Sequence, residues 1–130
     1  MNTKIIMTMS AVTLGAVGIF LIFMPDTILG QLDIDINKSA LILVQIMGAL
    51  YFAFGMLNWI TKASLIGGIY NRPIAVANFT HFLIAGLALI KGLISNPNSS
   101  HIIWIVGVIY FIFGVFFGVI LLRHPISETK

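Results

Sequence analysis

The sequence predicts an all-α fold, a polytopic bundle of four transmembrane helices. Of its 130 residues, 59% are hydrophobic and only 8% are charged, whereas a soluble domain carries about a quarter charged residues. A chain of this length cannot bury so much apolar surface in one core, so lipid must solvate most of it. The charged residues also divide the chain into four uncharged runs, each close to the roughly 20 residues that cross a bilayer. We expect a single membrane domain over residues 1–130.

The four uncharged runs define the helices that we expect. Each run must be helical, because a backbone amide exposed to lipid has no other hydrogen-bond partner. The first run is too long for the apolar part of a signal peptide and has no clear cleavage site before Pro25, so we interpret it as an uncleaved helix. The expected spans are residues 5–24, 39–61, 73–93 and 101–122.

A short interfacial helix is expected between the first and second spans, over residues 25–32. Pro25 suits the first turn of a helix, and Ile28, Leu29 and Leu32 recur at helical spacing.

Basic residues predict that both termini lie in the cytoplasm. Short cytoplasmic loops carry an excess of lysine and arginine. The two termini and the loop between the second and third spans hold five of the seven basic residues, and the other two loops hold two. The five are Lys4, Lys62, Arg72, Arg123 and Lys130, and the two are Lys38 and Lys91.

The same scatter of single basic residues excludes a nucleic-acid partner, which would need a clustered patch. The chain has no cysteine, which excludes disulfides and thiolate chemistry.

One phrase occurs twice, once in the second span and once in the fourth. The segments 48–55 and 107–114 share the pattern G-x-x-Y-F-x-F-G. A chance match among apolar residues is the alternative to a duplicated helical hairpin, whose two parallel copies would be related by a pseudo-twofold axis along the membrane normal. The glycines of the phrase lie seven residues apart on one helix face, and Gly118 extends the second copy. We assign Gly48, Gly55, Gly107, Gly114 and Gly118 to helix packing within the chain rather than to dimerisation.

Polar residues within the four uncharged runs, the third of which ends at Ile90 before Lys91, are few, and none of them is Asp, Glu, Lys or Arg. Proton-coupled pumps depend on membrane-embedded charges, so their absence argues against ion-coupled transport. Counting inward along the second and third spans places a set of polar side chains at similar depths. This candidate polar pocket consists of Tyr51, Asn58, Asn78 and His81, with Gln45 nearer the outer surface.

Two interpretations of the candidate polar pocket remain open. It could recognise a lipid headgroup, a quinone or another amphiphile, and His81 could pass a proton. Alternatively, its groups could form interhelical hydrogen bonds worth about 0.6 kcal/mol each. We favour the structural interpretation, because one histidine and two amides form no recognised catalytic set.

Metal, cofactor and catalytic sites are not predicted. His81, His101 and His124 do not share a helix face at ligand spacing, and the serines and threonines lack a base with an orienting partner. Lys62 and Arg72 form a cytoplasmic basic rim that could hold anionic lipid headgroups, unless they serve only to set topology.

The region from Gly48 to Ile90 carries two longer motifs, G-x-x-Y-F-x-F-G-x-x-N-W and N-R-P-I-A-x-A-N-F-T-H. In these it resembles small four-helix bacterial membrane proteins without a settled activity, loosely similar to the DoxX-like group. The resemblance implies a bacterial inner-membrane location and carries over no catalytic residue.

Three functions fit these observations. The first is a non-enzymatic protein that binds a lipid-like molecule or a membrane protein partner through the face of the second and third helices. The second is a quinone-associated or redox membrane enzyme that uses His81 and Tyr51. The third is an oligomeric channel or facilitator whose polar residues line a pore between subunits. An immunity or assembly protein is also compatible with the sequence, which includes no feature that tests it.

Overall fold

The computed structural model describes residues 2–66 and 68–123. Over these residues the chain is helical and has no strand. The elements are α1 (Thr3–Phe23), α2 (Pro25–Gln31), α3 (Lys38–Thr61), the 3-10 helix η1 (Ile69–Asn71), α4 (Arg72–Ser95) and α5 (His101–Leu122).

Four helices in the described chain are long and apolar enough to cross a membrane, and they correspond to α1, α3, η1 with α4, and α5. The third of these spans Ile69–Ser95, because η1 continues directly into α4. The prediction of an all-α chain with four membrane-length helices is confirmed. The protein is therefore a multi-pass membrane protein.

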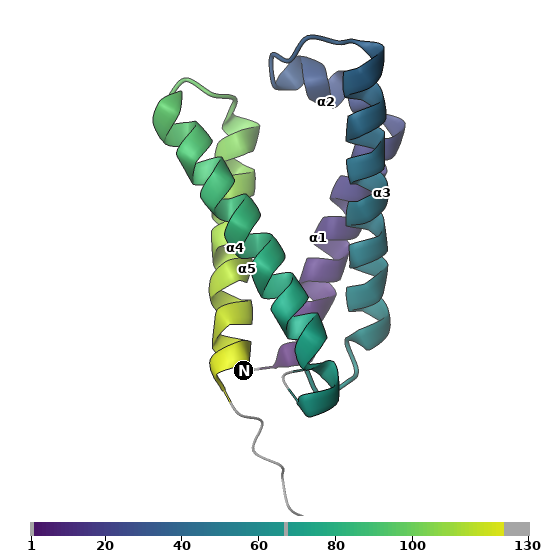
Figure 1. Ribbon diagram of the computed structural model, residues 1–130, viewed down its shortest axis with the longest axis vertical. Helices are drawn as coiled ribbons and strands as arrows, with labels where there is room; N and C mark the ends of the chain where they lie inside the picture. Colours follow the sequence, from purple (N-terminus) through teal and green to yellow (C-terminus); the bar gives the residue numbers. More distant parts are fainter. Residues whose placement is uncertain (1, 67, 124–130) are drawn as a thin grey trace, which may run out of the picture. The chain divides into compact units, whose positions relative to one another are not determined.

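The chain divides into two compact units. One runs from Met7 to Lys62 and contains most of α1 together with α2 and α3. The other runs from Ala63 onward, takes in the first six residues, and contains η1, α4 and α5. Figure 1 labels the helices of both units.

Local signals set the helix ends in the unit of α1, α2 and α3. Pro25 occupies the first turn of α2, where its missing N–H removes no helical hydrogen bond. After α2 the backbone adopts a left-handed conformation at Asp33, with φ of 54°. Asn37 then caps α3, because its side-chain oxygen accepts a hydrogen bond of 2.9 Å from the Ala40 amide.

The helices α4 and α5 form an antiparallel pair joined by a short turn, and they pack against one another at a crossing angle (Figure 1). Pro73 stands in the first turn of α4. At the other end, the Ser100 side chain caps α5 by accepting a hydrogen bond of 3.4 Å from the Ile102 amide. This pair holds the groove described below.

Candidate functional site: an apolar groove between α4 and α5

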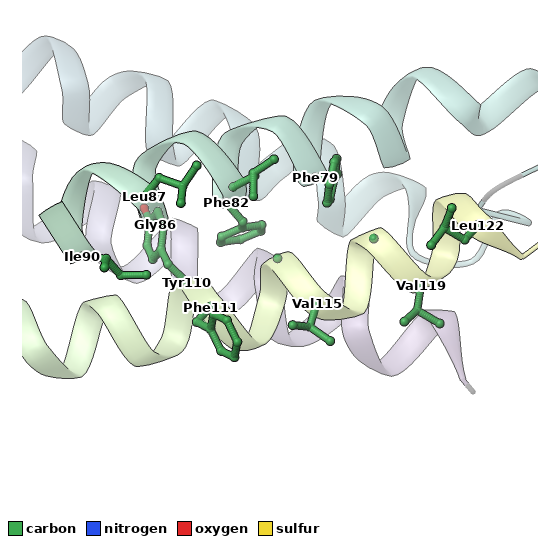
Figure 2. A pocket seen from close by; sticks show the side chains of 13 residues that line it. Phe79, Phe82, Gly86, Leu87, Ile90, Tyr110, Phe111, Val115, Val119 and Leu122 are labelled. Carbon is green, nitrogen blue, oxygen red and sulfur yellow. The ribbon is translucent and has the colours of Figure 1, made fainter.

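A groove runs along the pair formed by α4 and α5, with a cavity volume of about 340 Å³ (Figure 2). Its lining is hydrocarbon and aromatic, and one tyrosine contributes its ring near one end. The α4 side consists of Phe79, Phe82, Leu83, Gly86, Leu87 and Ile90, and the α5 side of Tyr110, Phe111, Gly114, Val115, Gly118, Val119 and Leu122.

Glycines hollow the groove, because each leaves out a side chain where the two helices face one another. A Cβ atom built on Gly86 would lie 3.7 Å from the Cβ of Tyr110, and one built on Gly114 would lie 4.0 Å from Phe82. Both are ordinary contact distances, so larger side chains are sterically admissible at the first carbon. Gly118 is tighter, with its built Cβ 3.1 Å from the Phe79 ring. The groove therefore owes its depth to missing side chains rather than to widely separated helices.

The base of the groove is aromatic and closely packed. Phe82 is only 1% exposed, and its ring stacks on Phe113 and Phe117 with centroids 4.9 and 5.7 Å apart. It also meets the Tyr110 ring edge to face, at 5.1 Å. Such aromatic pairs stabilise beyond their contact area. By contrast, the groove rim is open, since Phe111 is 62% and Leu87 is 58% exposed.

One polar contact lies behind the groove, between α4 and α5. The Nε2 atom of His81 is 3.3 Å from the hydroxyl oxygen of Tyr110, and either group can donate, depending on the imidazole tautomer. The Tyr110 residue is buried and its ring lines the groove, whereas His81 is half-buried and contributes no lining surface. A ligand in the groove therefore meets hydrocarbon almost throughout.

The residues of the candidate polar pocket are distributed over both units. Asn78 and His81 belong to α4, and the Asn78 amide donates to the Ile74 carbonyl of its own helix at 2.9 Å. The other three, Gln45, Tyr51 and Asn58, belong to α3. A joint pocket made from these five residues remains a prediction.

Two of the α3 residues make contacts with α1. The Asn58 amide donates to the Ser10 hydroxyl at 3.1 Å, and both residues are fully buried. The Gln45 amide reaches the Ile22 carbonyl at 3.4 Å.

Small residues bring α1 and α3 into backbone contact. A Cβ built on Gly18 would lie 2.6 Å from the Phe52 amide nitrogen, and one on Gly48 would lie 2.9 Å from the Gly18 carbonyl. A Cβ built on Gly55 would lie 2.7 Å from the Gly15 nitrogen. No side chain fits at these three positions unless the helices move apart.

The glycines of α5 are in a looser environment than those of α3. A Cβ on Gly107 would lie 3.5 Å from the Leu93 side chain, which is an ordinary contact. The two copies of the repeated phrase therefore differ in what their glycines face. In α3 they face backbone, and in α5 they face side chains or the groove.

Several residues of this architecture were not singled out from the sequence. The sequence marks Ser10 only as one of the serines without a base and an orienting partner, although it lies next to Ala11 in a series of small residues on α1. The groove lining was also missed, although Phe79, Phe82 and Gly86 recur at helical spacing. That spacing, opposite Gly114 and Gly118, was the available signal.

The two residues of the basic rim, Lys62 and Arg72, lie at the facing ends of α3 and α4 in the sequence. The Lys62 ammonium lies 2.9 Å from the centroid of the Trp59 ring, a cation–π contact at the end of α3. Arg72 is the first residue of α4 and is exposed. Over residues 2–66 and 68–123, no three metal-ligating side chains come together. His124 and Lys130 lie outside the described residues.

Comparison with models of known protein families, with curated proteins and with solved structures finds no match to this chain. The class of protein therefore follows from the helices alone, and it is a multi-pass α-helical membrane protein.

Proposed function

We propose that this membrane protein is non-enzymatic and binds the alkyl chain of a lipid in the groove between α4 and α5. The observation that carries the proposal is the groove itself, a cavity of about 340 Å³ with an apolar lining. Ligand sites in proteins usually measure about 300–1,000 Å³ and are lined by hydrophobic and aromatic side chains. An alkyl chain matches a lining that offers almost no hydrogen-bonding surface.

The length of the groove supports a single lipid chain. On α5 the lining runs from Tyr110 to Leu122, which at 1.5 Å per residue is about 18 Å. One leaflet contributes about half of the roughly 30 Å hydrocarbon core. The groove therefore has the length of one leaflet's acyl chain. The exposed rim at Leu87 and Phe111 gives a bilayer lipid lateral access.

Photo-crosslinking in liposomes tests this proposal. Protein reconstituted with a phospholipid that carries a diazirine along one acyl chain should be labelled at groove residues such as Leu87 and Val115, as mapped by peptide mass spectrometry. Replacing Gly114 by Leu should reduce that labelling several-fold, because the new side chain projects into the cavity beyond a Cβ position that itself has room.

The matched control is Gly92→Leu, on α4 outside the groove. Its built Cβ has no heavy atom within 4 Å, so it adds the same volume to the lipid-facing surface without entering the cavity. Circular dichroism and size-exclusion chromatography verify that both variants fold. Equal labelling in the wild type and both folded variants contradicts groove binding.

A second candidate has a specific observation in its favour, namely the contact of 3.3 Å between His81 and Tyr110 behind the groove. A quinone has an apolar tail that fits the groove and a carbonyl oxygen that could bind the Tyr110 hydroxyl, with His81 orienting that hydroxyl from behind, in a redox enzyme or its accessory. The sequence alone predicts Tyr51 as the partner of His81 for such an enzyme. The test is extraction of quinone from the purified protein. Quinone that is present in the wild type and lost from both Tyr110→Phe and His81→Leu would support this alternative over the lipid site proposed above.

For location we propose a bacterial inner membrane with both termini in the cytoplasm, consistent with the positions of the basic residues and with the DoxX-like resemblance. Cysteine labelling tests the orientation, because the sequence has no cysteine and each variant of this protein therefore carries one introduced thiol. In intact cells, a membrane-impermeant maleimide should label Asn98→Cys, between α4 and α5, and should leave Ser64→Cys unlabelled until the cells are lysed. The reverse pattern contradicts this orientation.

The remaining proposals concern ancestry and assembly. The repeated G-x-x-Y-F-x-F-G phrase supports a duplicated hairpin. A homo-oligomer, a channel formed between subunits, or a complex with another membrane protein is tested by native mass spectrometry from mild detergent, which reports subunit number and bound lipid together.

A further inference from the structure

The two ends of the groove differ in their surroundings. One end lies at Tyr110 and Ile90, well inside both helices. The other end lies at Leu122, the last residue of α5, and is followed directly by Arg123. The groove therefore opens toward a membrane surface only at the Arg123 end.

A second arginine lies at that same end of the hairpin. Across the pair of helices, Gly86 lies next to Tyr110 and Phe79 lies next to Gly118. Continuing this antiparallel register brings Arg72, the first residue of α4, to within about two residues of the level of Arg123. Figure 1 shows the start of α4 and the end of α5 at the same end of the pair.

Both arginines are available to a ligand. Arg72 and Arg123 are exposed, and neither has an ion pair with another residue of the described chain. A guanidinium group binds phosphate oxygens in a planar, bidentate manner. Basic residues at the membrane surface attract anionic lipids.

We propose that the ligand of the groove is an anionic phospholipid from the leaflet at the Arg72 and Arg123 end. One acyl chain fills the groove with its methyl end toward Tyr110, and the phosphate lies at the two guanidinium groups. The inference rests on the proposed function and adds the leaflet and the headgroup class.

A lipid of the opposite leaflet fits less well. Lys91 is the nearest described basic residue toward that side, and it follows Ile90 at the inner end of the groove. A headgroup at the opposite surface would leave only the distal part of its chain to reach the cavity. Lys91 therefore serves as a matched control for charge.

The test is a competition measured by native mass spectrometry on the delipidated full-length protein in detergent, where orientation in a membrane plays no part. Phosphatidylglycerol and phosphatidylethanolamine with identical acyl chains are the probes. We expect a preference for phosphatidylglycerol that falls about fivefold for Arg72→Gln or Arg123→Gln and roughly 25-fold for both, since each surface arginine contributes a factor of about five. Lys91→Gln should leave the preference unchanged.

The outcomes separate the two proposals. If Gly114→Leu lowers binding of both lipids while the arginine variants leave their ratio unchanged, the groove binds a chain but the headgroup inference is wrong. If folded Gly114→Leu binds both lipids as the wild type does, groove binding itself fails. An equal loss of preference in Lys91→Gln and Arg72→Gln shows a general charge effect and also overturns the headgroup inference.

Discussion

The side-chain amide of Asn58 donates a hydrogen bond of 3.1 Å to the hydroxyl of Ser10, and this contact joins α3 to α1 at a position closed to solvent and lipid. The Ser10 hydroxyl in turn donates to the Met7 carbonyl at 3.0 Å. One serine oxygen therefore acts as acceptor for the neighbouring helix and as donor to its own. Hydrogen bonds between transmembrane helices contribute about 0.6 kcal/mol on average and up to about 1.7 kcal/mol.

The first prediction concerns this pair. Asn58→Leu and Ser10→Ala should each lower the free energy of unfolding, and a double-mutant cycle should give a coupling energy of about 0.6–1.7 kcal/mol. Ser10→Ala removes a partner from a buried amide, whereas the double variant no longer has that amide to satisfy. SDS-induced unfolding of the purified protein measures all four corners of the cycle.

Thr61→Val is the control for this cycle. The Thr61 hydroxyl donates to the Leu57 carbonyl of its own helix at 2.7 Å, so its loss should be additive with Ser10→Ala. A coupling energy near zero for Asn58 and Ser10 would show that the hydrogen bond contributes nothing to stability.

The second prediction concerns the glycine contacts between α1 and α3. Gly55→Ala should destabilise the protein by about 1–3 kcal/mol, the usual cost of overpacking. The added Cβ would lie 2.7 Å from the Gly15 nitrogen and 2.9 Å from the Ala11 carbonyl oxygen, and backbone atoms cannot rotate away. The same unfolding assay measures the change.

Gly15→Ala is the matched control on the opposite helix. Its Cβ would meet no heavy atom within 4 Å, and alanine favours the helix by up to about 1 kcal/mol relative to glycine. Gly15→Ala should therefore be neutral or stabilising. Equal destabilisation by both substitutions would contradict the contact geometry.

The same two helices show what the sequence could predict. The positions of the charged residues delimit the four membrane-length segments. Each segment must be helical, because in lipid every backbone N–H and C=O needs a partner within the protein. Glycine spacing in one helix does not determine how closely it packs. Gly48 and Gly107 occupy equivalent positions in the repeated phrase, but Gly48 faces Gly18, whereas Gly107 faces Leu93. The partner helix decides the outcome, and a single-helix pattern does not identify it.

The candidate site illustrates a related difficulty. The members of the candidate polar pocket share a depth in the membrane, yet depth does not specify rotation about the helix axis. Asn58 bonds to Ser10 on α1, and His81 bonds to Tyr110 on α5. Neither Ser10 nor Tyr110 belongs to the candidate polar pocket. The apolar groove had no polar marker at all. Sequence reasoning that searches for function among polar groups does not find such a site.

The third prediction tests the aromatic base of the groove. Phe82→Ala should destabilise the protein by about 2–3 kcal/mol, below the range for soluble cores, because lipid is as apolar as the protein interior and mainly the packing is lost. Phe82 stacks with Phe113 and Phe117, and its removal leaves a cavity between α4 and α5. SDS-induced unfolding again provides the measurement.

Phe111→Ala is the control for this substitution. Phe111 also lines the groove from α5, but it is 62% exposed, so lipid can fill the space that it leaves. Its loss should cost much less than that of Phe82. Comparable losses at the two positions would indicate that the aromatic stack makes no special contribution.

The fourth prediction concerns the turn that ends α2. Asp33 has a φ of 54°, and its amide bonds to the Gly30 carbonyl at 3.3 Å, while the Ile34 amide bonds to the Leu29 carbonyl at 3.0 Å. This pattern is a Schellman motif, in which glycine is the preferred residue at the left-handed position. Asp33→Gly removes the steric cost of a Cβ there, partly offset by the greater freedom of glycine in the unfolded chain, so it should stabilise the protein by roughly 0.5–1 kcal/mol.

Asp35→Gly separates this backbone effect from the loss of a negative charge. Asp35 lies two residues further along the same connection and is exposed, and Asp33 is the only described non-glycine residue with positive φ. Asp35→Gly should therefore be neutral or slightly destabilising, because glycine adds freedom to the unfolded chain without relieving strain. If both substitutions stabilise the protein equally in SDS-induced unfolding, the charge rather than the left-handed turn accounts for the gain.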